Sequence, residues 1–126
     1  MKRHQWSEIP REQLNPGFAR QVIHTDRMTI ARWYFRAGST VLRHSHENEQ
    51  ISLVDKGRLK FVFDDREVIV EAGQSMQIPS HAPHSVDALE DAEGYDLFAP
   101  VRADWLSGDD AYLRGGAGGS AAKASS

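Results

Sequence analysis

Short runs of Val, Ile, Phe, Tyr and Trp recur along this chain, and turn-forming residues separate them at intervals of about ten positions. This spacing favours short strands over helices, which need longer periodic segments. The predicted strands are Ala19–His24, Met28–Arg36, Thr40–His44, Gln50–Asp55, Gly57–Phe63, Arg66–Glu71, Ser75–Ile78, His84–Ala88 and Gly94–Ala99. Only Ala103–Leu106, which Gly108 follows, has the pattern of a short helix. The predicted fold class is therefore an all-β barrel or sandwich.

The chain length of 126 residues suits one domain. The last residues, Gly115–Ser126, read GGAGGSAAKASS and offer nothing to bury. We predict a single folded domain over residues 1–114, followed by a disordered Gly/Ala/Ser tail.

Composition excludes several classes of function. The net charge of −3 argues against nucleic acid as a partner, because phosphate binding needs a basic excess. The absence of cysteine excludes disulfides, thiolate metal sites and cysteine nucleophiles. We expect no membrane span, because no apolar run approaches the roughly 18 residues that a spanning helix needs. The polar start of the chain shows no signal peptide, so a cytoplasmic location is expected.

His44 and His46 form an HxH pair at the end of a predicted strand. Side chains two positions apart on a strand point to the same face, so both imidazoles can reach one metal ion. An alternative interpretation is a pair of solvent-facing histidines on a sheet edge.

Two segments place glycines at fixed distances from histidines. They are GSTVLRHSHENEQISLVDKG (residues 38–57) and GQSMQIPSHAPH (residues 73–84). They resemble the two signature motifs of the cupin superfamily, G-x5-HxH-x3-E-x6-G and G-x5-P-x-G-x2-H. The resemblance implies a single-domain, jelly-roll-like cupin β-barrel with one metal ion at its centre.

By this resemblance the metal ligands are His44, His46, Gln50 and His84. Gln50 stands where the motif has Glu, and the alternative is that Glu49 turns inward instead. Gln50 is preferred because its spacing fits the motif and Glu49 alternates to the opposite face. His81 replaces the inner glycine of the second motif; we interpret it as a loop residue at the barrel mouth rather than an extra ligand.

The expected cofactor is one divalent transition metal: Ni, Fe, Mn, Zn or Cu. Neutral ligands would leave the ion its full charge, which makes it a stronger Lewis acid but weakens its retention.

Strand alternation also predicts which neighbours of the ligands point inward. Ser52 and Val54 share a face with Gln50, and Val86 shares one with His84. The side chains expected to point outward are Ile51, Leu53, Ile69 and Leu97. A second copy of the chain would cover this apolar face, so we expect a homodimer.

Asp96, Phe98 and Arg102 form a second candidate group. On their own, Asp96 and Arg102 are equally well interpreted as surface charges. Their D-x-F-x3-R spacing resembles small cupins of the KdgF type, which act in uronate breakdown. That resemblance implies a small anionic substrate, a 4,5-unsaturated monouronate from pectin or alginate, which is ring-opened and tautomerised to a linear keto acid.

In this interpretation Asp96 moves a proton between oxygen and carbon, Arg102 pairs with the substrate carboxylate and Phe98 packs against the sugar ring. Two alternatives remain: an oxygen-dependent cupin dioxygenase acting on a diketone or flavonol, and a non-catalytic cupin that binds a sugar or a metal. One barrel supports many chemistries, so the fold alone does not choose between them.

Overall fold

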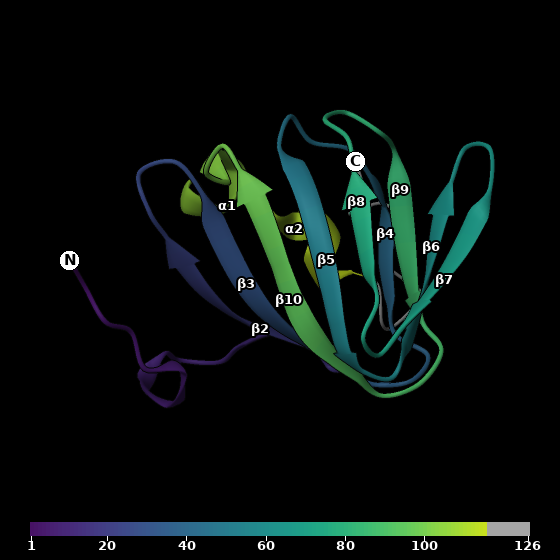
Figure 1. Ribbon diagram of the computed structural model, residues 1–126, viewed down its shortest axis with the longest axis horizontal. Coiled ribbons are helices and arrows are strands. Elements are labelled where there is room, and N and C mark those ends of the chain that lie inside the picture. Colours follow the sequence, from purple (N-terminus) through teal and green to yellow (C-terminus); the bar gives the residue numbers. More distant parts are fainter. Residues whose placement is uncertain (116–126) are drawn as a thin grey trace.

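Two antiparallel β-sheets face each other in the protein, whose computed structural model describes residues 1–115 (Figure 1). In that range the strands are β1 (Glu12–Asn15), β2 (Phe18–His24), β3 (Thr29–Phe35), β4 (Thr40–His44), β5 (Glu49–Lys56), β6 (Arg58–Phe63), β7 (Glu67–Glu71), β8 (Ser75–Ile78), β9 (His84–Ala88) and β10 (Ala92–Ala99). The helical elements are the 3-10 turn η1 (Trp6–Glu8) and the short helices α1 (Ala103–Leu106) and α2 (Ala111–Arg114). The all-β prediction is confirmed.

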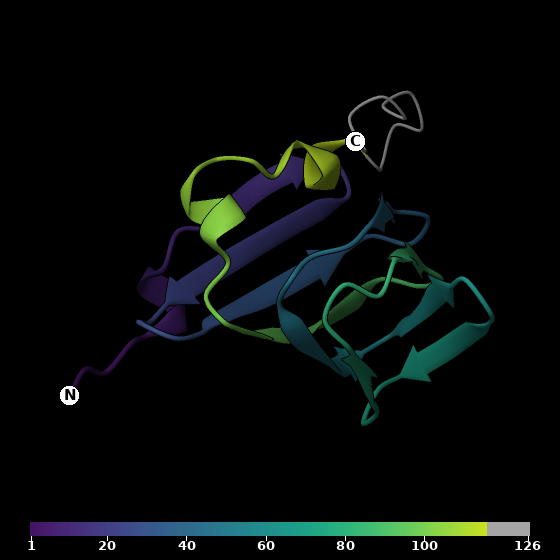
Figure 2. The ribbon, with the colours of Figure 1, turned by 90° about the horizontal axis from the view of Figure 1, so that it is seen from above.

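The larger sheet has six strands in the order β1-β2-β3-β10-β5-β8, and the smaller has four in the order β4-β9-β6-β7. Figure 2 shows α1 and α2 beside the β1–β2 end of the larger sheet. The segment that follows β10 therefore returns across the end of the barrel.

Apolar side chains fill the space between the sheets because each strand alternates its side chains between two faces. The larger sheet contributes Trp33, Phe35 and Ile78, and the smaller contributes Phe61 and Val86. The alternation predicted for β5 is confirmed: Ser52 and Val54 are buried with Gln50, whereas Ile51 is exposed.

The structure adds β1, which the sequence analysis did not predict. Its sequence, Glu-Gln-Leu-Asn, is too polar to show a strand pattern, yet it pairs with β2 through a tight turn. The Asn15 side chain closes this turn by accepting a hydrogen bond from the Gly17 amide at 2.9 Å.

Strand β10 begins two residues before its predicted start at Gly94. Gly94 lies inside the strand, opposite Trp33 on β3. A Cβ atom at Gly94 would lie 2.0 Å from the Leu53 carbonyl oxygen and 2.5 Å from the Trp33 ring. Position 94 therefore requires glycine because the neighbouring atoms pack closely against it, not because the chain turns there.

The helix predicted at Ala103–Leu106 is present as α1, whereas α2 was not predicted. The predicted tail begins at Gly115, which is buried at the end of α2; residues 116–126 lie outside the described residues. Within residues 1–115, no helix is both long and apolar enough to cross a membrane.

Candidate metal centre

Three histidines converge at the opening between the sheets. His44 ends β4 and His84 begins β9, where the two residues are direct partners in the strand register. His46 lies just beyond the end of β4, so its orientation depends on the loop rather than on strand alternation. One nitrogen from each ring lies within 4.8 Å of the others. Nitrogens that share one metal ion lie about 3 to 4 Å apart, so small ring rotations would complete a site.

The Nδ1 atom of each ring is engaged by a backbone carbonyl two residues away. The contacts are His44 to Leu42 at 2.7 Å, His46 to Asn48 at 2.9 Å and His84 to Ala82 at 2.8 Å. Since a carbonyl only accepts, each Nδ1 carries the proton and each Nε2 keeps a free lone pair. This arrangement is typical of metal-binding histidines.

All three imidazoles are held neutral. Burial lowers the pKa of His44 to about 3, and repulsion from His84 adds to this effect. Burial likewise lowers the pKa of His46 to about 4, and it lowers the pKa of His84. Neutral imidazoles are the form that binds metal, so protons compete little with a metal near pH 7.

Gln50 on β5 completes the cluster, and it carries the clearest sign that a cation fits there. Its Oε1 atom lies 3.0 Å from His46 Nε2. Both atoms are acceptors when His46 carries its proton on Nδ1, so a cation between them would satisfy both lone pairs. Gln50 is 5% exposed, whereas Glu49 points to solvent. The structure therefore places Gln50, not Glu49, beside the histidines.

His81 lies outside this cluster. It is exposed in the loop before β9, with φ at +66°, a conformation that glycine adopts most easily. Its amide donates a hydrogen bond to the His46 carbonyl at 2.7 Å. These features agree with the interpretation of His81 as a loop residue at the barrel mouth.

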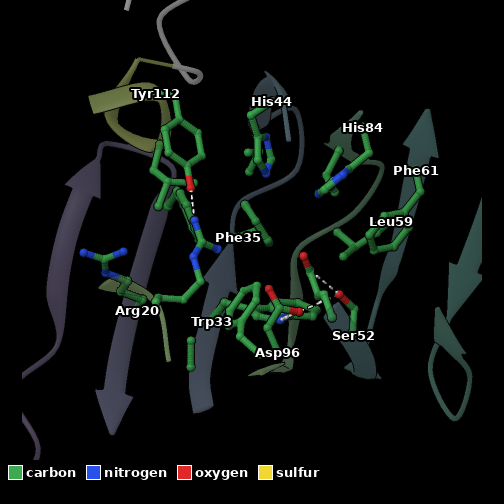
Figure 3. A pocket seen from close by; sticks show the side chains of 18 of the residues that line it. Arg20, Trp33, Phe35, His44, Ser52, Leu59, Phe61, His84, Asp96 and Tyr112 are labelled. Carbon is green, nitrogen blue, oxygen red and sulfur yellow. Dashed lines mark hydrogen bonds between the residues drawn. The ribbon is translucent and has the colours of Figure 1, made fainter. Parts of the chain in front are cut away.

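Asp96 lies on the floor of the same cavity, on β10 directly opposite Ser52 of β5 (Figure 3). Its Oδ1 atom accepts hydrogen bonds from Ser52 Oγ at 2.6 Å and from Trp33 Nε1 at 3.0 Å. The missing side chain at Gly94 leaves room for the Trp33 ring that makes this contact. Burial raises the pKa of Asp96 to about 6, and the hydrogen bonds from Ser52 and Trp33, the charge of Arg102 and a hydrogen bond from Gln50 oppose this rise.

Arg102 is 1% exposed and lines the same cavity. It is not free: its Nε and Nη2 donate to the two Asp104 oxygens at 2.9 and 2.7 Å, and Nη2 also donates to the Tyr112 hydroxyl. Burial opposes its charge, but the Asp104 hydrogen bonds outweigh this and raise the pKa of Arg102. None of the Arg102 hydrogen bonds in the described residues uses Nη1.

Phe98 forms part of the cavity wall between the histidines and Arg102. Its ring lies edge-on to His46 at 5.7 Å and to Trp105 of α1 at 5.2 Å between centroids. The Arg102 guanidinium lies 4.6 Å from the Phe98 ring centre. The structure thus brings Asp96, Phe98 and Arg102 to one cavity with the histidines, as the sequence pattern predicts.

Helix α2 covers this cavity with Tyr112, a residue that the sequence analysis did not identify. The Tyr112 ring lies 4.6 Å from His44 between centroids, and its hydroxyl meets Arg102 (Figure 3). The cavity measures about 40 Å³, room for a few water molecules. Sites for small molecules are usually several hundred Å³. No pattern in the sequence links Tyr112 to the histidines, because a loop determines where α2 packs.

Comparison with known proteins gives a consistent result. The family model described as the Cupin domain matches residues 31–97, which include the four candidate ligands and Asp96. No curated protein matches the chain.

Three solved structures illustrate the similarity. KdgF from Halomonas sp. is 29% identical, with 79% of this chain and 95% of that chain covered and a TM-score of 0.74. An RmlC-like cupin from Desulfovibrio desulfuricans is 30% identical, with 80% and 98% covered and a TM-score of 0.64. An RmlC-like cupin from Shewanella frigidimarina is 23% identical, with 83% and 96% covered and a TM-score of 0.77.

Proposed function

The chain belongs to the cupin family, and from that premise we propose that it is a metal-dependent isomerase. Its proposed substrates are 4,5-unsaturated monouronates, which it converts to linear keto acids. The proposal draws on the similarity to KdgF and on the D-x-F-x3-R pattern of Asp96, Phe98 and Arg102.

One observation carries the proposal: the Asp96 carboxyl and the Arg102 guanidinium lie in the same small cavity as the neutral histidines. Asp96 has a pKa of about 6, raised by burial, so it can both take and return a proton near neutral pH. His44, His46, His84 and Gln50 would hold a divalent ion, which supplies a Lewis acid for substrate oxygens.

The reaction needs one proton to move and no oxidant. The hydroxyl at C1 loses its proton, the bond from C1 to the ring oxygen breaks, and C1 becomes an aldehyde. The electron pair of that bond passes through the ring oxygen, which becomes the C5 ketone as C4 takes up a proton. Asp96 would accept the first proton on Oδ2, because the Trp33 and Ser52 hydrogen bonds both end on Oδ1, and return it to C4.

Arg102 would bind the substrate carboxylate through Nη1 while Asp104 fixes its orientation. A monouronate is larger than the present cavity of about 40 Å³. We therefore propose that Tyr112 and α2 move aside when substrate enters.

The test follows the absorbance of the conjugated double bond of 4,5-unsaturated galacturonate, without oxygen and with metal-loaded protein. These sugars open slowly by themselves, so only the rate above background counts. A large acceleration is expected, with equal rates in the presence and absence of oxygen because the reaction consumes none. An oxygen-dependent cupin would instead require oxygen.

His84→Ala is the matched control, since it removes one ligand from the cluster. It should return the rate to background. Background rates for both proteins would contradict the proposal, and so would an equal acceleration by both.

A further inference from the structure

A chain of hydrogen bonds joins the metal cluster to the floor of the cavity through Ser52, a residue without an assigned role. We propose that Ser52 is a positioning residue, which fixes the Gln50 amide so that its oxygen, not its nitrogen, faces the three histidines. This inference deepens the proposed function because it concerns the same site, but it does not depend on the substrate.

Trp33 determines which groups donate and which accept in this chain of hydrogen bonds. The indole nitrogen is only a donor, and it donates to Asp96 Oδ1 at 3.0 Å. An oxygen that already accepts one hydrogen bond is a poor place for a proton when the other oxygen is free. Asp96 Oδ1 therefore acts as an acceptor whether or not Oδ2 carries a proton.

Ser52 must then donate to Asp96. The two residues face each other across β5 and β10, with Ser52 Oγ 2.6 Å from Oδ1. A serine hydroxyl has a single proton, which this contact uses. Only the lone pairs of Ser52 Oγ remain for any other neighbour, and Ser52 is 1% exposed, so water has little access.

The remaining neighbour is Gln50, whose Nε2 donates to Ser52 Oγ at 2.9 Å. The amide oxygen and nitrogen lie on opposite sides of the same group, so this bond turns Oε1 toward His46. Without Ser52 the amide would keep only its weaker contact with the Asp96 carboxyl. It could then rotate and present two N–H groups to the lone pairs of the histidines and to a bound metal ion.

Glutamine suits position 50 for the same reason. A carboxylate there could not donate to Ser52, which would face two acceptors with one proton. Gln50 therefore donates to Ser52, and Ser52 donates to Asp96. Because Asp96 accepts this hydrogen bond on Oδ1, Oδ2 can face the cavity.

A double-mutant cycle on Co²⁺ affinity tests this proposal, with the metal itself as the probe. Ser52→Ala should weaken Co²⁺ binding about tenfold, as loss of a group that supports a ligand does. In the Gln50→Ala background, the same substitution should have no further effect, because Ser52 acts through Gln50. Relative to the wild type, the visible spectrum of bound Co²⁺ should change in the same way in Ser52→Ala, in Gln50→Ala and in the double variant.

Two results would overturn the proposal: an equal loss of affinity in both backgrounds, which indicates a general structural effect, or no loss in the wild-type background. Circular dichroism of each metal-free variant checks folding.

A measurement on the wild-type protein remains decisive if Ser52→Ala does not fold. In the Zn²⁺-loaded protein the Gln50 side-chain amide resonance, assigned by its loss in Gln50→Ala, should show one slowly exchanging proton. Fast exchange of both protons would contradict the proposal. Neither readout involves a uronate, so a failure of the proposed activity would leave this result unaffected.

Discussion

The two oxygens of Asp96 have different surroundings, and this difference gives the residue its chemical use. The Trp33 and Ser52 hydrogen bonds both end on Oδ1, whereas Oδ2 can exchange a proton with a bound molecule. Burial raises the pKa of the carboxyl to about 6. The Asp96 side chain is thus held in one orientation, and it can gain or lose a proton near neutral pH.

We predict that the isomerase rate depends on the ionised form of Asp96. A general base works only when deprotonated, so kcat/KM should be constant above about pH 7 and fall roughly tenfold per pH unit well below pH 6. The measurement is the pH profile of uronate ketonisation, with metal content checked at each pH. Asp96→Asn should lower the rate by about 10²- to 10⁴-fold and retain bound metal. A flat wild-type profile down to pH 5 would contradict the prediction.

At the scale of elements, the sequence was most informative where strands are regular. Strands β4, β8 and β9 have the predicted bounds, because alternating apolar residues and nearby turn residues delimit them. The cupin barrel predicted from the two motifs is confirmed. Strand β1 and helix α2 were missed because long-range contacts stabilise them. Asn15 of β1, for example, donates to the Leu113 carbonyl of α2 at 3.1 Å.

In the candidate site too, the sequence did not predict features that depend on long-range contacts. The two cupin motifs fix the spacing of the histidines and Gln50, and the D-x-F-x3-R pattern indicated Asp96. The sequence analysis expected Arg102 to be free for a substrate, but the structure shows Asp104 on two of its nitrogens. It also missed Tyr112, whose place over His44 depends on how the loop after α1 folds back.

A buried ion pair attaches α2 to the larger sheet, which leads to a prediction about stability. The side chains of Arg20 on β2 and Asp110 before α2 are each 5% exposed, and Arg20 Nη2 lies 2.5 Å from Asp110 Oδ2. Among the described residues, Asp110→Ala would leave buried Arg20 with only Glu12 as an ionic partner, at a cost of about 3 kcal/mol. Urea unfolding measures this loss.

The adjacent Asp109→Ala is the matched control, because Asp109 is exposed and, within residues 1–115, its side chain accepts a hydrogen bond only from the Ser107 hydroxyl. It should change the free energy of unfolding by less than about 0.5 kcal/mol. Equal effects of the two substitutions would contradict a specific role for the buried pair.

At the scale of the whole molecule, stability should depend on metal and on pH together. An ion that binds only the folded state adds about 2.7 kcal/mol when its free concentration is 100 times Kd. Burial lowers the pKa values of His44 and His46 to about 3 and 4, from 6.5 in the unfolded chain. Below pH 6.5 the unfolded chain therefore binds protons that the folded metal-free protein does not.

The metal-free protein should consequently lose stability as the pH falls from about 6.5 toward 4. Each such histidine contributes up to about 1.4 kcal/mol per pH unit over that window. Thermal unfolding at pH 7 and pH 5, with chelator or with added Zn²⁺, measures both effects. Removing His44 with His44→Ala should reduce the acid sensitivity of the metal-free form. A midpoint that is independent of chelator and pH would contradict the prediction.

Finally, an apolar patch on the outer face of the larger sheet bears on the assembly of the molecule. Ile51 on β5 and Leu97 on β10 are direct partners in the strand register, and the two residues are 39% and 36% exposed. Adjacent apolar side chains on a sheet favour contact with another surface. A second copy of the chain would bury the same patch from both sides around a two-fold axis, so we predict a homodimer.

Light scattering after size-exclusion chromatography should give twice the chain mass for the wild type at micromolar concentrations. Leu97→Asp should shift the mass to that of one chain, because the charge would have to be buried in the interface. The sequence analysis grouped Ile69 with Ile51 and Leu97 on one apolar face, but Ile69 lies on β7 of the smaller sheet, where it is 50% exposed. Ile69→Asp is therefore a control, and it should remain dimeric. A monomeric wild type would contradict the prediction, and a dimer broken only by Ile69→Asp would move the interface to the smaller sheet.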